Sequence, residues 1–327
     1  MEKAQLIISR NRIGTDGEGI RTLVSFAGCP LNCRYCINPH LKKEFPEEKR
    51  YTPQSLLDKL SVDRHIFLAT GGGVTFSGGE PLLHGCFIKE FCEKCDPRWG
   101  INMETSLYVP REMVTMLLDY VDTWIVDIKT TDPEKYEAYT GKSISRALSN
   151  LIYLSEELAC RPEKKLVVRV PEIPEYTDAE DSDDAVLFLK GQLGCDVTFD
   201  HVRYIKGRFS ADAPNGKHIC ELLRAVKTLL AENNGIELNL HECSNTGNCS
   251  GTCPFCDMET ERLNNELDRK QKVEYSMVRE QIEARFPEEL AFKFSASPND
   301  DKDMMVMGET CFPDILEGEC LVLKDEE

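Results

Sequence analysis

Three cysteines near the start of the sequence have the residue type and the spacing to bind a metal cluster. Cys29, Cys33 and Cys36 lie in the run GCPLNCRYCINP, directly after an apolar, strand-like run. Cysteine thiolates are the usual protein ligands of iron–sulfur clusters, and a cubane [4Fe–4S] cluster has four irons to coordinate. Three thiolates leave one iron without a protein ligand, and an open coordination position is typical of a catalytic metal. The spacing therefore predicts a [4Fe–4S] cluster with catalytic chemistry.

A second group of cysteines lies closer to the end of the chain. Four thiols fall within fourteen residues, among glycines and a proline that allow the chain to wrap around one metal centre. Four thiolates suit either an auxiliary [4Fe–4S] cluster or a structural zinc ion. The cluster is our preferred interpretation, with zinc and a metal-free loop as alternatives, and His241 is not needed as a ligand. The four cysteines are Cys243, Cys249, Cys253 and Cys256.

The remaining eight cysteines carry weaker signals. Three lie on an expected helix, where a buried cysteine behaves as a small hydrophobic residue. Two near the end of the sequence could complete a second auxiliary site, and three are isolated. In that order they are Cys86, Cys92 and Cys95; Cys311 and Cys320; and Cys160, Cys195 and Cys220.

Short apolar runs alternate with amphipathic runs and predict the elements that must position these residues. Alternating β and α elements favour parallel strands joined by right-handed crossovers. The charged region from 259 to 285 is also expected to be helical. We expect strands at 6–8, 22–26, 73–76, 101–103, 124–128, 166–170 and 201–205, and helices at 53–60, 86–95, 110–118, 143–158 and 217–232.

Five further stretches accompany the first cysteines: DGEGIRT at 16–22, LVSF at 23–26, GGVTFSGGEP at 72–81, VDTWIVDIK at 121–129 and RVPEIPEYTD at 169–178. In this order they resemble the radical S-adenosylmethionine (SAM) superfamily and, within it, the activating enzymes of glycyl radical enzymes. The resemblance runs from about residue 5 to about residue 210. It implies an α/β fold, an open partial (β/α)6 barrel whose site lies at the carboxyl ends of the strands.

The resemblance also implies that SAM binds the open iron through its amino and carboxylate groups. Glycines after a strand allow close approach of the backbone, so carbonyl groups there could meet the SAM ammonium. Lys129 offers a cation for the SAM carboxylate or ribose, and Arg169 offers its guanidinium to the carboxylate. Glu104 with Asp127 is interpreted either as a monovalent-cation site, since carboxylate oxygens suit hard cations, or as a hydrogen-bonding pair for SAM. The expected SAM contacts are Ser77, Gly78, Gly79, Glu80, Thr105, Asp127, Lys129 and Arg169.

Several positions depart from the family pattern. Glu18 replaces a proline that would fix φ and remove a donor, and Glu175 stands where the family commonly has glycine. Residues 204–208, YIKGR, replace an expected Leu-Pro-Tyr-His stretch, and the family's ferredoxin insert after the first cysteines is absent. Substrate recognition is therefore expected to differ. The residues that the resemblance places against a substrate peptide backbone are Asp16, Gly17 and Arg21.

Composition limits the classes of partner. The 327 residues include 57 acidic and 39 basic ones, a formal net charge of −18, which disfavours nonspecific nucleic-acid binding and an anionic membrane surface. The first residues lack a signal-peptide layout, and no apolar run approaches the roughly 20 residues that span a bilayer. We expect a cytoplasmic protein with a radical SAM core at 1–240 and a small Cys-rich, metal-binding extension at 241–327, divided into an auxiliary-cluster loop at 241–258 and a helix and tail at 259–327.

These observations predict a radical SAM enzyme that takes one electron from a flavodoxin or ferredoxin, cleaves SAM and abstracts hydrogen from a peptide or protein. Activation of a glycyl radical enzyme is the preferred reaction. A maturase acting on a ribosomally made precursor peptide is the alternative that the second cysteine group favours. A noncatalytic iron–sulfur or zinc protein is disfavoured by the intact stretch at 77–80, and a small-molecule enzyme similar to the deazaguanine-forming relative is a minor option.

Overall fold

The parallel sheet that the sequence predicts is present in the structure, a computed structural model that describes residues 3–42, 49–194, 196–204, 216–240, 251–293 and 306–307. The sheet has the strand order β3-β1-β2-β4-β5-β6-β7-β8-β9, and every pair from β2 to β9 is parallel. This is the α/β architecture expected for a radical SAM partial barrel. The strands are β1 (Ala4–Arg12), β2 (Arg21–Phe26), β3 (Arg50–Tyr51), β4 (Gly73–Gly78), β5 (Gly100–Thr105), β6 (Thr123–Asp127), β7 (Lys165–Glu172), β8 (Val197–Tyr204) and β9 (Val306–Met307).

The first strand differs from the expected parallel arrangement. β1 pairs antiparallel with β2, with Leu6 opposite Phe26 and Arg12 opposite Arg21. The connection between them, residues 13–20, is too short for the dozen or more residues that a parallel crossover needs. β1 therefore runs beside β2 in the opposite direction. The loop at 13–20, which joins these two strands, lies at the amino ends of the parallel strands.

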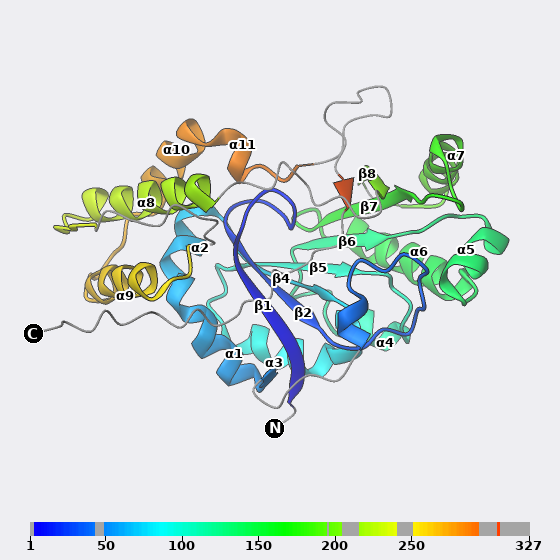
Figure 1. The fold of residues 1–327 in the computed structure, drawn as a ribbon, viewed down its shortest axis with the longest axis horizontal. Helices are drawn as coiled ribbons and strands as arrows, with labels where there is room; N and C mark the ends of the chain where they lie inside the picture. The colour runs from blue at the N-terminus through cyan, green and yellow to red at the C-terminus, as the bar shows by residue number, and fades with distance from the viewer. Residues whose placement is uncertain are drawn as a thin grey trace, which may run out of the picture.

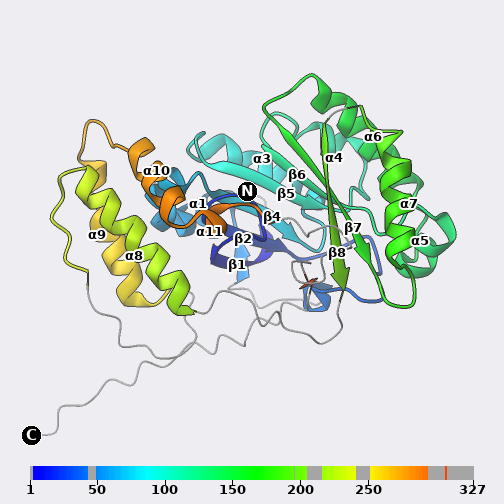
Figure 2. The ribbon, with the colours of Figure 1, turned by 90° about the horizontal axis from the view of Figure 1, so that it is seen from above.

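Helices cover the sheet in two groups (Figures 1 and 2). The helices that connect the strands pack on its outer face, and α8 to α11 lie together beside α2. The predicted helix at 110–118 is shorter, because α4 gives way to turns after Thr115. The helices are α1 (Pro53–Leu60), α2 (Arg64–Thr70), α3 (Gly85–Lys94), α4 (Arg111–Thr115), α5 (Pro133–Thr140), α6 (Ser145–Ala159), α7 (Ala179–Lys190), α8 (Gly216–Asn233), α9 (Pro254–Asp268), α10 (Ser276–Arg285) and α11 (Pro287–Leu290), with short 3-10 turns at Pro39–Lys42, Ser61–Asp63 and Pro81–His84.

Local sequence signals begin these helices where the structure has them. Thr52 and Asp178 each form a capping box, with Ser55 and Asp181 respectively. Asp132 caps α5 by accepting from the amides of its first turn, directly before a proline at the first helical position. Such caps satisfy amide groups that have no partner within the helix. They fix where each strand-to-helix connection ends, and so hold the strand ends in place.

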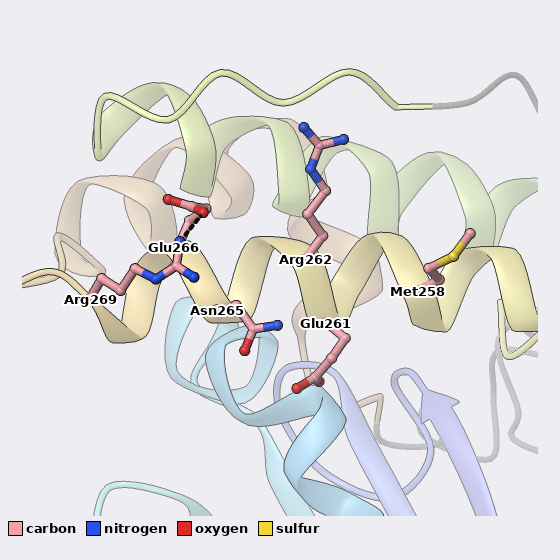
Figure 3. A pocket seen from close by; sticks show the side chains of 6 residues that line it. All are labelled: Met258, Glu261, Arg262, Asn265, Glu266 and Arg269. Atoms are coloured by element: carbon pink, nitrogen blue, oxygen red, sulfur yellow. Dashed lines mark hydrogen bonds and ion pairs between the residues drawn. The ribbon is translucent and has the colours of Figure 1, made fainter.

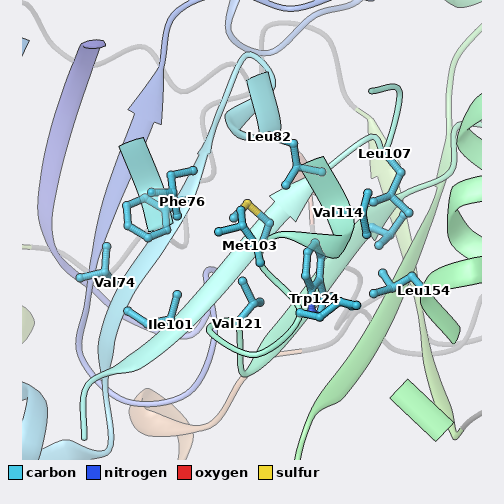
Figure 4. Packing of buried hydrophobic residues seen from close by; sticks show 14 of the residues in the cluster. Val74, Phe76, Leu82, Ile101, Met103, Leu107, Val114, Val121, Trp124 and Leu154 are labelled. Atoms are coloured by element: carbon cyan, nitrogen blue, oxygen red, sulfur yellow. The ribbon is translucent and has the colours of Figure 1, made fainter. Parts of the chain in front are cut away.

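Two hydrophobic clusters follow the two groups of helices. The larger one lies between the sheet and its outer helices, where Phe76, Met103 and Trp124 from adjacent strands are fully buried (Figure 4). The second joins α2 to α8, α9, α10 and α11 and includes the fully buried Leu222 and Leu263. Helix α8 therefore packs with the C-terminal helices. Within the described ranges no helix is long and apolar enough to cross a membrane.

Candidate active site

The cysteine loop, residues 27–38, leaves the carboxyl end of β2 and is tied to the structure on several sides. The amides of Ala27 and Gly28 donate to the carbonyls of Gln5 and Leu41 at 2.9 and 3.0 Å. Farther on, the Asn32 amide donates to the Thr140 carbonyl at 2.9 Å, at the end of α5. All three thiols, at Cys29, Cys33 and Cys36, are partly buried.

The glycine pair at the end of β4 allows this loop to lie where it does. The amide of Gly79 donates to the Phe26 carbonyl at 2.9 Å, and the amide of Glu80 donates to the Gly28 carbonyl at 2.8 Å. A Cβ atom at Gly79 would lie 2.0 Å from the Gly28 oxygen, and Gly78 has φ +112° with its Cβ position 2.5 Å from the Phe26 nitrogen. Only glycine permits this approach and this φ. The predicted SAM-binding stretch therefore also positions the cysteines.

The three thiols lie close enough to influence one another. Burial raises the pKa of Cys29 to about 12, and the negative charges of Glu80, Cys33 and Cys36 add to the effect. Burial also raises the pKa of Cys33, while the Lys129 ammonium opposes it. Free thiolates are thus disfavoured at Cys29 and Cys33 unless a cation is bound, and metal coordination deprotonates a thiol outright.

The residues present fit a metal cluster. One loop provides three neighbouring thiols, and a bound cation would offset the free energy that burial adds to their ionisation. Nearby, the Oδ1 atom of Asp127 is buried with no hydrogen-bond partner in the protein, a polar atom suited to a bound ligand or cation. In the described part of the chain, no three His, Cys, Asp or Glu side chains are grouped as ligands of a single metal ion.

Lys129 and Asp127 form one pair at the carboxyl end of β6. The Lys129 ammonium donates to Asp127 Oδ2 at 3.0 Å. Burial lowers the pKa of Lys129, but the charges of Asp127 and Cys33 outweigh burial and the pKa is raised overall. The lysine therefore stays charged between the cysteine loop and the strand ends, as its predicted role at SAM requires.

The carboxylate of Glu80 points into the protein. It is fully buried and accepts from the hydroxyls of Thr105 and Ser106 and from the amides of Ser106 and Leu82. Burial raises the pKa of Glu80, and these four donors oppose the rise. Glu80 and Thr105 thus bond to each other here, and the backbone of this stretch is the part left to meet a ligand.

Glu104 lies inside the barrel between two of the other predicted contacts. Its Oε2 atom accepts from the Ser77 hydroxyl at 2.6 Å, and its Oε1 atom accepts from Arg169 Nη1 at 2.9 Å. Arg169 also donates to Asp200 Oδ2 at 3.1 Å and to the Thr15 carbonyl at 2.8 Å. The guanidinium therefore provides the cation nearest to Glu104 in the structure.

The loop predicted to meet substrate is held from within. Asp16 Oδ2 accepts from Arg12 Nε at 2.6 Å, and its carbonyl accepts from the side chains of Thr75 and Asn102. Arg21 donates to the Val74 and Gly100 carbonyls at 2.8 and 2.6 Å and is buried. A Cβ atom at Gly17 would lie 2.0 Å from Asn102 Nδ2. Both charged side chains are thus committed to the amino ends of the strands, and a substrate role for this loop stays a prediction.

The departures from the family pattern have visible consequences. Glu175 has φ +70°, a left-handed conformation that glycine adopts freely and that costs other residues roughly 1–2 kcal/mol. Glu18, which replaces a proline, is exposed and accepts from Lys165 Nζ at 2.7 Å. The backbone at position 175 thus keeps the left-handed conformation that suits glycine, although the residue here is a glutamate.

The second cysteine group is only partly within the described residues. Cys253 is the N-cap of α9 and Cys256 lies in its first turn. The other predicted ligands, Cys243 and Cys249, lie outside the described residues, as do Cys195, Cys311, Cys320, His241 and the 205–208 part of the YIKGR stretch.

Sequence reasoning missed several polar residues that hold the site. Asp200 is fully buried beside Arg169, and Asn38 donates to the Gly78 carbonyl at 3.3 Å. Asp200 stands opposite Arg169 in the register of β7 and β8, a pairing that the sequence alone does not show. Asn38 carries no sequence signal either, since it depends on how the cysteine loop folds back.

A shallow hollow on the exposed face of α9 lies apart from the cysteine loop (Figure 3). Three of its charged side chains pair within the protein: Arg269 donates to Glu266 at 2.5 Å, and Glu261 faces Arg64 at 3.5 Å. We assign no ligand to it. The lining residues are Met258, Glu261, Arg262, Asn265, Glu266 and Arg269.

Comparison with known proteins agrees with this geometry. The model of the radical SAM superfamily matches residues 23–180, from β2 into α7. The pyruvate formate-lyase-activating enzyme of Clostridium pasteurianum is 34% identical over 169 residues, covering 51% of this chain and 68% of that enzyme. This chain belongs to the radical SAM superfamily. Membership implies a [4Fe–4S] cluster and SAM as cofactors.

Other relatives of this radical SAM chain are also activating enzymes. The pyruvate formate-lyase 1-activating enzyme of Escherichia coli K12 is 31% identical over 171 residues, covering 51% of this chain and 67% of that enzyme. The (2S)-3-sulfopropanediol dehydratase activating enzyme of Klebsiella oxytoca is 28% identical over 225 residues, covering 50% and 69%. The aligned part is about half of this chain.

Proposed function

We propose that this radical SAM enzyme activates a glycyl radical enzyme. Bound SAM, reduced by one electron, would supply a 5′-deoxyadenosyl radical and release methionine, and the chain would position a glycine Cα of the partner to give up its hydrogen atom, so that 5′-deoxyadenosine is the product. The observation that carries the proposal is the group of three neighbouring thiols, on a loop that the amides of Gly79 and Glu80 hold against the end of β4. The activating enzymes among its relatives support the choice of substrate.

The residues of the chain would bind and orient the reactants. Cys29, Cys33 and Cys36 would hold the cluster, which supplies the electron when bound. The backbone at 77–79 faces the cysteine loop and would receive the SAM ammonium, while the charged Lys129 would meet its carboxylate or ribose. Such fixed positioning contributes several kcal/mol to a reaction, because it replaces diffusion and solvent reorganisation.

Arg169 and Glu104 have a different task in this proposal. Their ion pair, with Ser77 and Asp200 bonded to it, forms a rigid floor below the strand ends. Arg169 would present a guanidinium to the SAM carboxylate, and Asp127 with its free Oδ1 atom would accept from SAM or bind a monovalent cation. The electron donor would be a low-potential flavodoxin or ferredoxin.

The C-terminal cysteines would hold a second centre. We propose an auxiliary [4Fe–4S] cluster there, with zinc as the alternative, formed by Cys243, Cys249, Cys253 and Cys256 on an extension at 241–327. Ten free cysteines in the described residues favour a reducing compartment, for which the cytoplasm is our proposal.

The test is an anaerobic assay of the reconstituted protein with dithionite and SAM, with 5′-deoxyadenosine measured by mass spectrometry. We expect product from the wild type and from Cys160→Ala, an exposed cysteine away from the loop, and only background from Cys33→Ala. A Cys33→Ala variant that still forms 5′-deoxyadenosine would contradict the assignment of the cluster.

The second stage distinguishes the substrates. Incubation with a candidate glycyl radical enzyme should give a glycyl doublet in the electron paramagnetic resonance spectrum, lost when the target glycine is replaced by alanine. A chain that forms 5′-deoxyadenosine and modifies a small precursor peptide, without a doublet on any glycyl radical enzyme, would be a peptide maturase instead.

A further inference from the structure

The chain that follows α11 lies against the loop between β1 and β2 (Figure 1). The Gly19 amide of this loop donates to the Leu290 carbonyl at 2.8 Å. Farther along, the Lys293 amide donates to the Gly14 carbonyl, also at 2.8 Å. Backbone hydrogen bonds at two nearby points fix the path of the chain between them. Phe292 lies within this fixed segment, directly before its second anchor.

Apolar packing holds the same two segments together. Leu290, at the end of α11, is 5% exposed and belongs to the second hydrophobic cluster, as does Ile20 of the loop, which is 1% exposed. The stem of Lys293 covers Gly14, because a Cβ atom at Gly14 would lie 3.1 Å from Lys293 Cδ. The position of Phe292 therefore follows from the packing of α11 against the loop.

Phe292 lies over the guanidinium of Arg169, a side chain of β7 that is buried inside the barrel. The centroid of the Phe292 ring is 5.7 Å from Arg169 Cζ, within the roughly 6 Å over which a cation and an aromatic face attract each other. Arg169 is 6% exposed, and Phe292 is partly buried at this contact. The ring thus covers the guanidinium on one side, where water would otherwise solvate it.

The edge of the same guanidinium is bonded to three acceptors. Arg169 donates to Asp200 Oδ2 at 3.1 Å and to Glu104 Oε1 at 2.9 Å. It also donates to the Thr15 carbonyl at 2.8 Å. A guanidinium has five N–H donors, so these bonds with described residues leave two donors for a ligand. Thr15 belongs to the loop to which the chain after α11 is anchored. That chain therefore contacts Arg169 directly, through Phe292, and indirectly, through the loop carbonyl.

We propose that Phe292 is a positioning residue for SAM: it holds the Arg169 guanidinium in the orientation that receives the SAM carboxylate. This role rests on the one proposed above for Arg169, and it comes from a part of the chain beyond the residues 23–180 that match the superfamily model. A guanidinium whose plane is already fixed loses less freedom when a ligand binds. Phe292 would act through Arg169 and not on SAM itself.

The test measures SAM binding to the full-length, reconstituted chain without reductant, so that SAM is bound and not cleaved. Equilibrium dialysis with radiolabelled SAM gives the dissociation constant. We expect Phe292→Ala to raise that constant at least about fivefold, because the cation–π contact with Arg169 is lost. Phe292→Tyr keeps the aromatic face and should bind SAM as the wild type does. The matched control is Phe255→Ala, which removes a ring of α9 that is 60% exposed and should leave the constant unchanged.

Steady-state kinetics of 5′-deoxyadenosine formation with dithionite should agree with the binding data. We expect the KM for SAM to rise in Phe292→Ala by the same factor as the dissociation constant, with kcat within about twofold of the wild type. A rise in KM alone is the result of lost binding that is equal in the ground state and the transition state. A fall in kcat without a change in KM would contradict a role in positioning SAM.

A double-mutant cycle tests whether Phe292 acts through Arg169. Arg169→Lys keeps a positive charge beside Glu104 and Asp200 but has no planar group for the ring to orient. We expect Phe292→Ala to weaken SAM binding less than about twofold in the Arg169→Lys chain. An equal loss in both backgrounds would mean that Phe292 acts on the fold and not on Arg169, and would overturn the proposed role.

The remaining outcomes separate this role from the proposed function. Unchanged SAM binding in Phe292→Ala, in a wild type that binds SAM, would overturn the role of Phe292 alone. Weakened binding in Phe292→Tyr, equal to that in Phe292→Ala, would also overturn it, because the aromatic face is then not what matters. A wild-type chain that does not bind SAM would overturn the proposed function and this role together.

Discussion

The cysteine loop after β2 and the junction of α8 and α9 surround their thiols with the same types of groups. At the loop, Cys33 lies beside Lys129, whose ammonium is bonded to Asp127 at 3.0 Å. At the junction, Cys256 lies beside Lys227, whose ammonium is bonded to Glu259 at 2.9 Å. Each place also has a glycine with a close neighbour: an added Cβ atom would lie 2.0 Å from the Gly28 carbonyl oxygen at Gly79 and 2.4 Å from the Leu223 side chain at Gly251. A lysine paired with a carboxylate is thus the shared electrostatic setting of both groups, and it is buried at the junction and partly buried at the loop.

The two places differ in where their thiols come from. The loop draws three from eight consecutive residues, so their proximity follows from the local sequence. At the junction, Cys220 lies on α8 while Cys253 and Cys256 lie at the start of α9, so how near they come depends on the packing of two helices. The comparison teaches that a group of residues within one segment is visible as a spacing, whereas a contact between two helices appears only with the tertiary structure.

The largest effect should follow from Gly79→Ala, which acts on the loop alone. The new methyl group would lie 2.0 Å from the Gly28 carbonyl oxygen, so the backbone before Cys29 must move. We expect the rate of 5′-deoxyadenosine formation to fall at least about 100-fold, because a displacement of reacting groups by about 1 Å lowers a rate by roughly that factor. We also expect loss of iron from the first cluster. Gly194→Ala, where nothing lies within 4 Å of the added atom, is the control and should keep full activity.

The next effect should come from Lys227→Met at the junction. Removing one partner of a buried ion pair costs roughly 3–5 kcal/mol, so we expect a lower free energy of unfolding, measured with urea. The double variant Lys227→Met, Glu259→Leu should recover most of the loss, because both charges are then removed. If the double variant is no more stable than the single one, the pair does not account for the loss.

A smaller effect is expected from Gly251→Ala. Its left-handed φ costs an alanine about 1–2 kcal/mol, and the contact with Leu223 adds to this because a side chain must move. Gly235→Ala is the matched control, since Gly235 has φ +62° but open space around it. Gly251→Ala should therefore be the less stable of the two in thermal unfolding and should also lower the iron of the second centre. Equal melting temperatures of Gly251→Ala and Gly235→Ala would mean that the close approach of Leu223 to Gly251 adds nothing to the destabilisation.

The smallest effect concerns the joint between α2 and the C-terminal helices. His65 bonds to Tyr275 at 2.5 Å and to Asp268 at 2.8 Å. Burial lowers the pKa of His65, Asp268 opposes this, and Arg64 and Arg98 add to the lowering. A lowered pKa favours the neutral imidazole in the folded chain, so the stability it contributes is present above pH 6.5 and is lost as the pH falls below that value.

We therefore expect the melting temperature to fall between pH 7.5 and pH 5.5, and His65→Gln to reduce that fall. The effect should be under about 1 kcal/mol, because Asp268 is half exposed and such pairs contribute little. His218→Gln, which removes another histidine–carboxylate pair, is the control. An unchanged pH dependence in His65→Gln would exclude this residue as the source.

The sequence predicts most of the fold because alternation of apolar strands and amphipathic helices is a local property. The parallel order from β2 to β8 and the starts of helices at Thr52 and Asp178 were open to such reasoning. The antiparallel β1 could have been predicted from the short connection at 13–20. The packing of α8 with α9 and α10 could not, because an amphipathic helix does not specify which apolar surface covers it.

The candidate site also has a part that the sequence predicts and a part that depends on tertiary structure. The motifs identify Ser77, Glu104 and Arg169, but not that these side chains bond to one another inside the barrel. Their pairing depends on strand register, which places polar residues of adjacent strands at one level. Their roles toward SAM stay predictions, as do those of Asp16 and Arg21.

The loop between β1 and β2 forms hydrogen bonds with residues that are synthesised much later than the loop itself. Its Gly19 amide donates to the Leu290 carbonyl at 2.8 Å, and its Gly14 carbonyl accepts from the Lys293 amide at 2.8 Å. Ribosomes add roughly 5–20 residues per second, so these backbone groups wait roughly 15–50 seconds for their partners. During that interval the nascent barrel exposes the amino ends of its strands to water and chaperones. This rim is therefore among the last parts of the molecule to acquire its native hydrogen bonds.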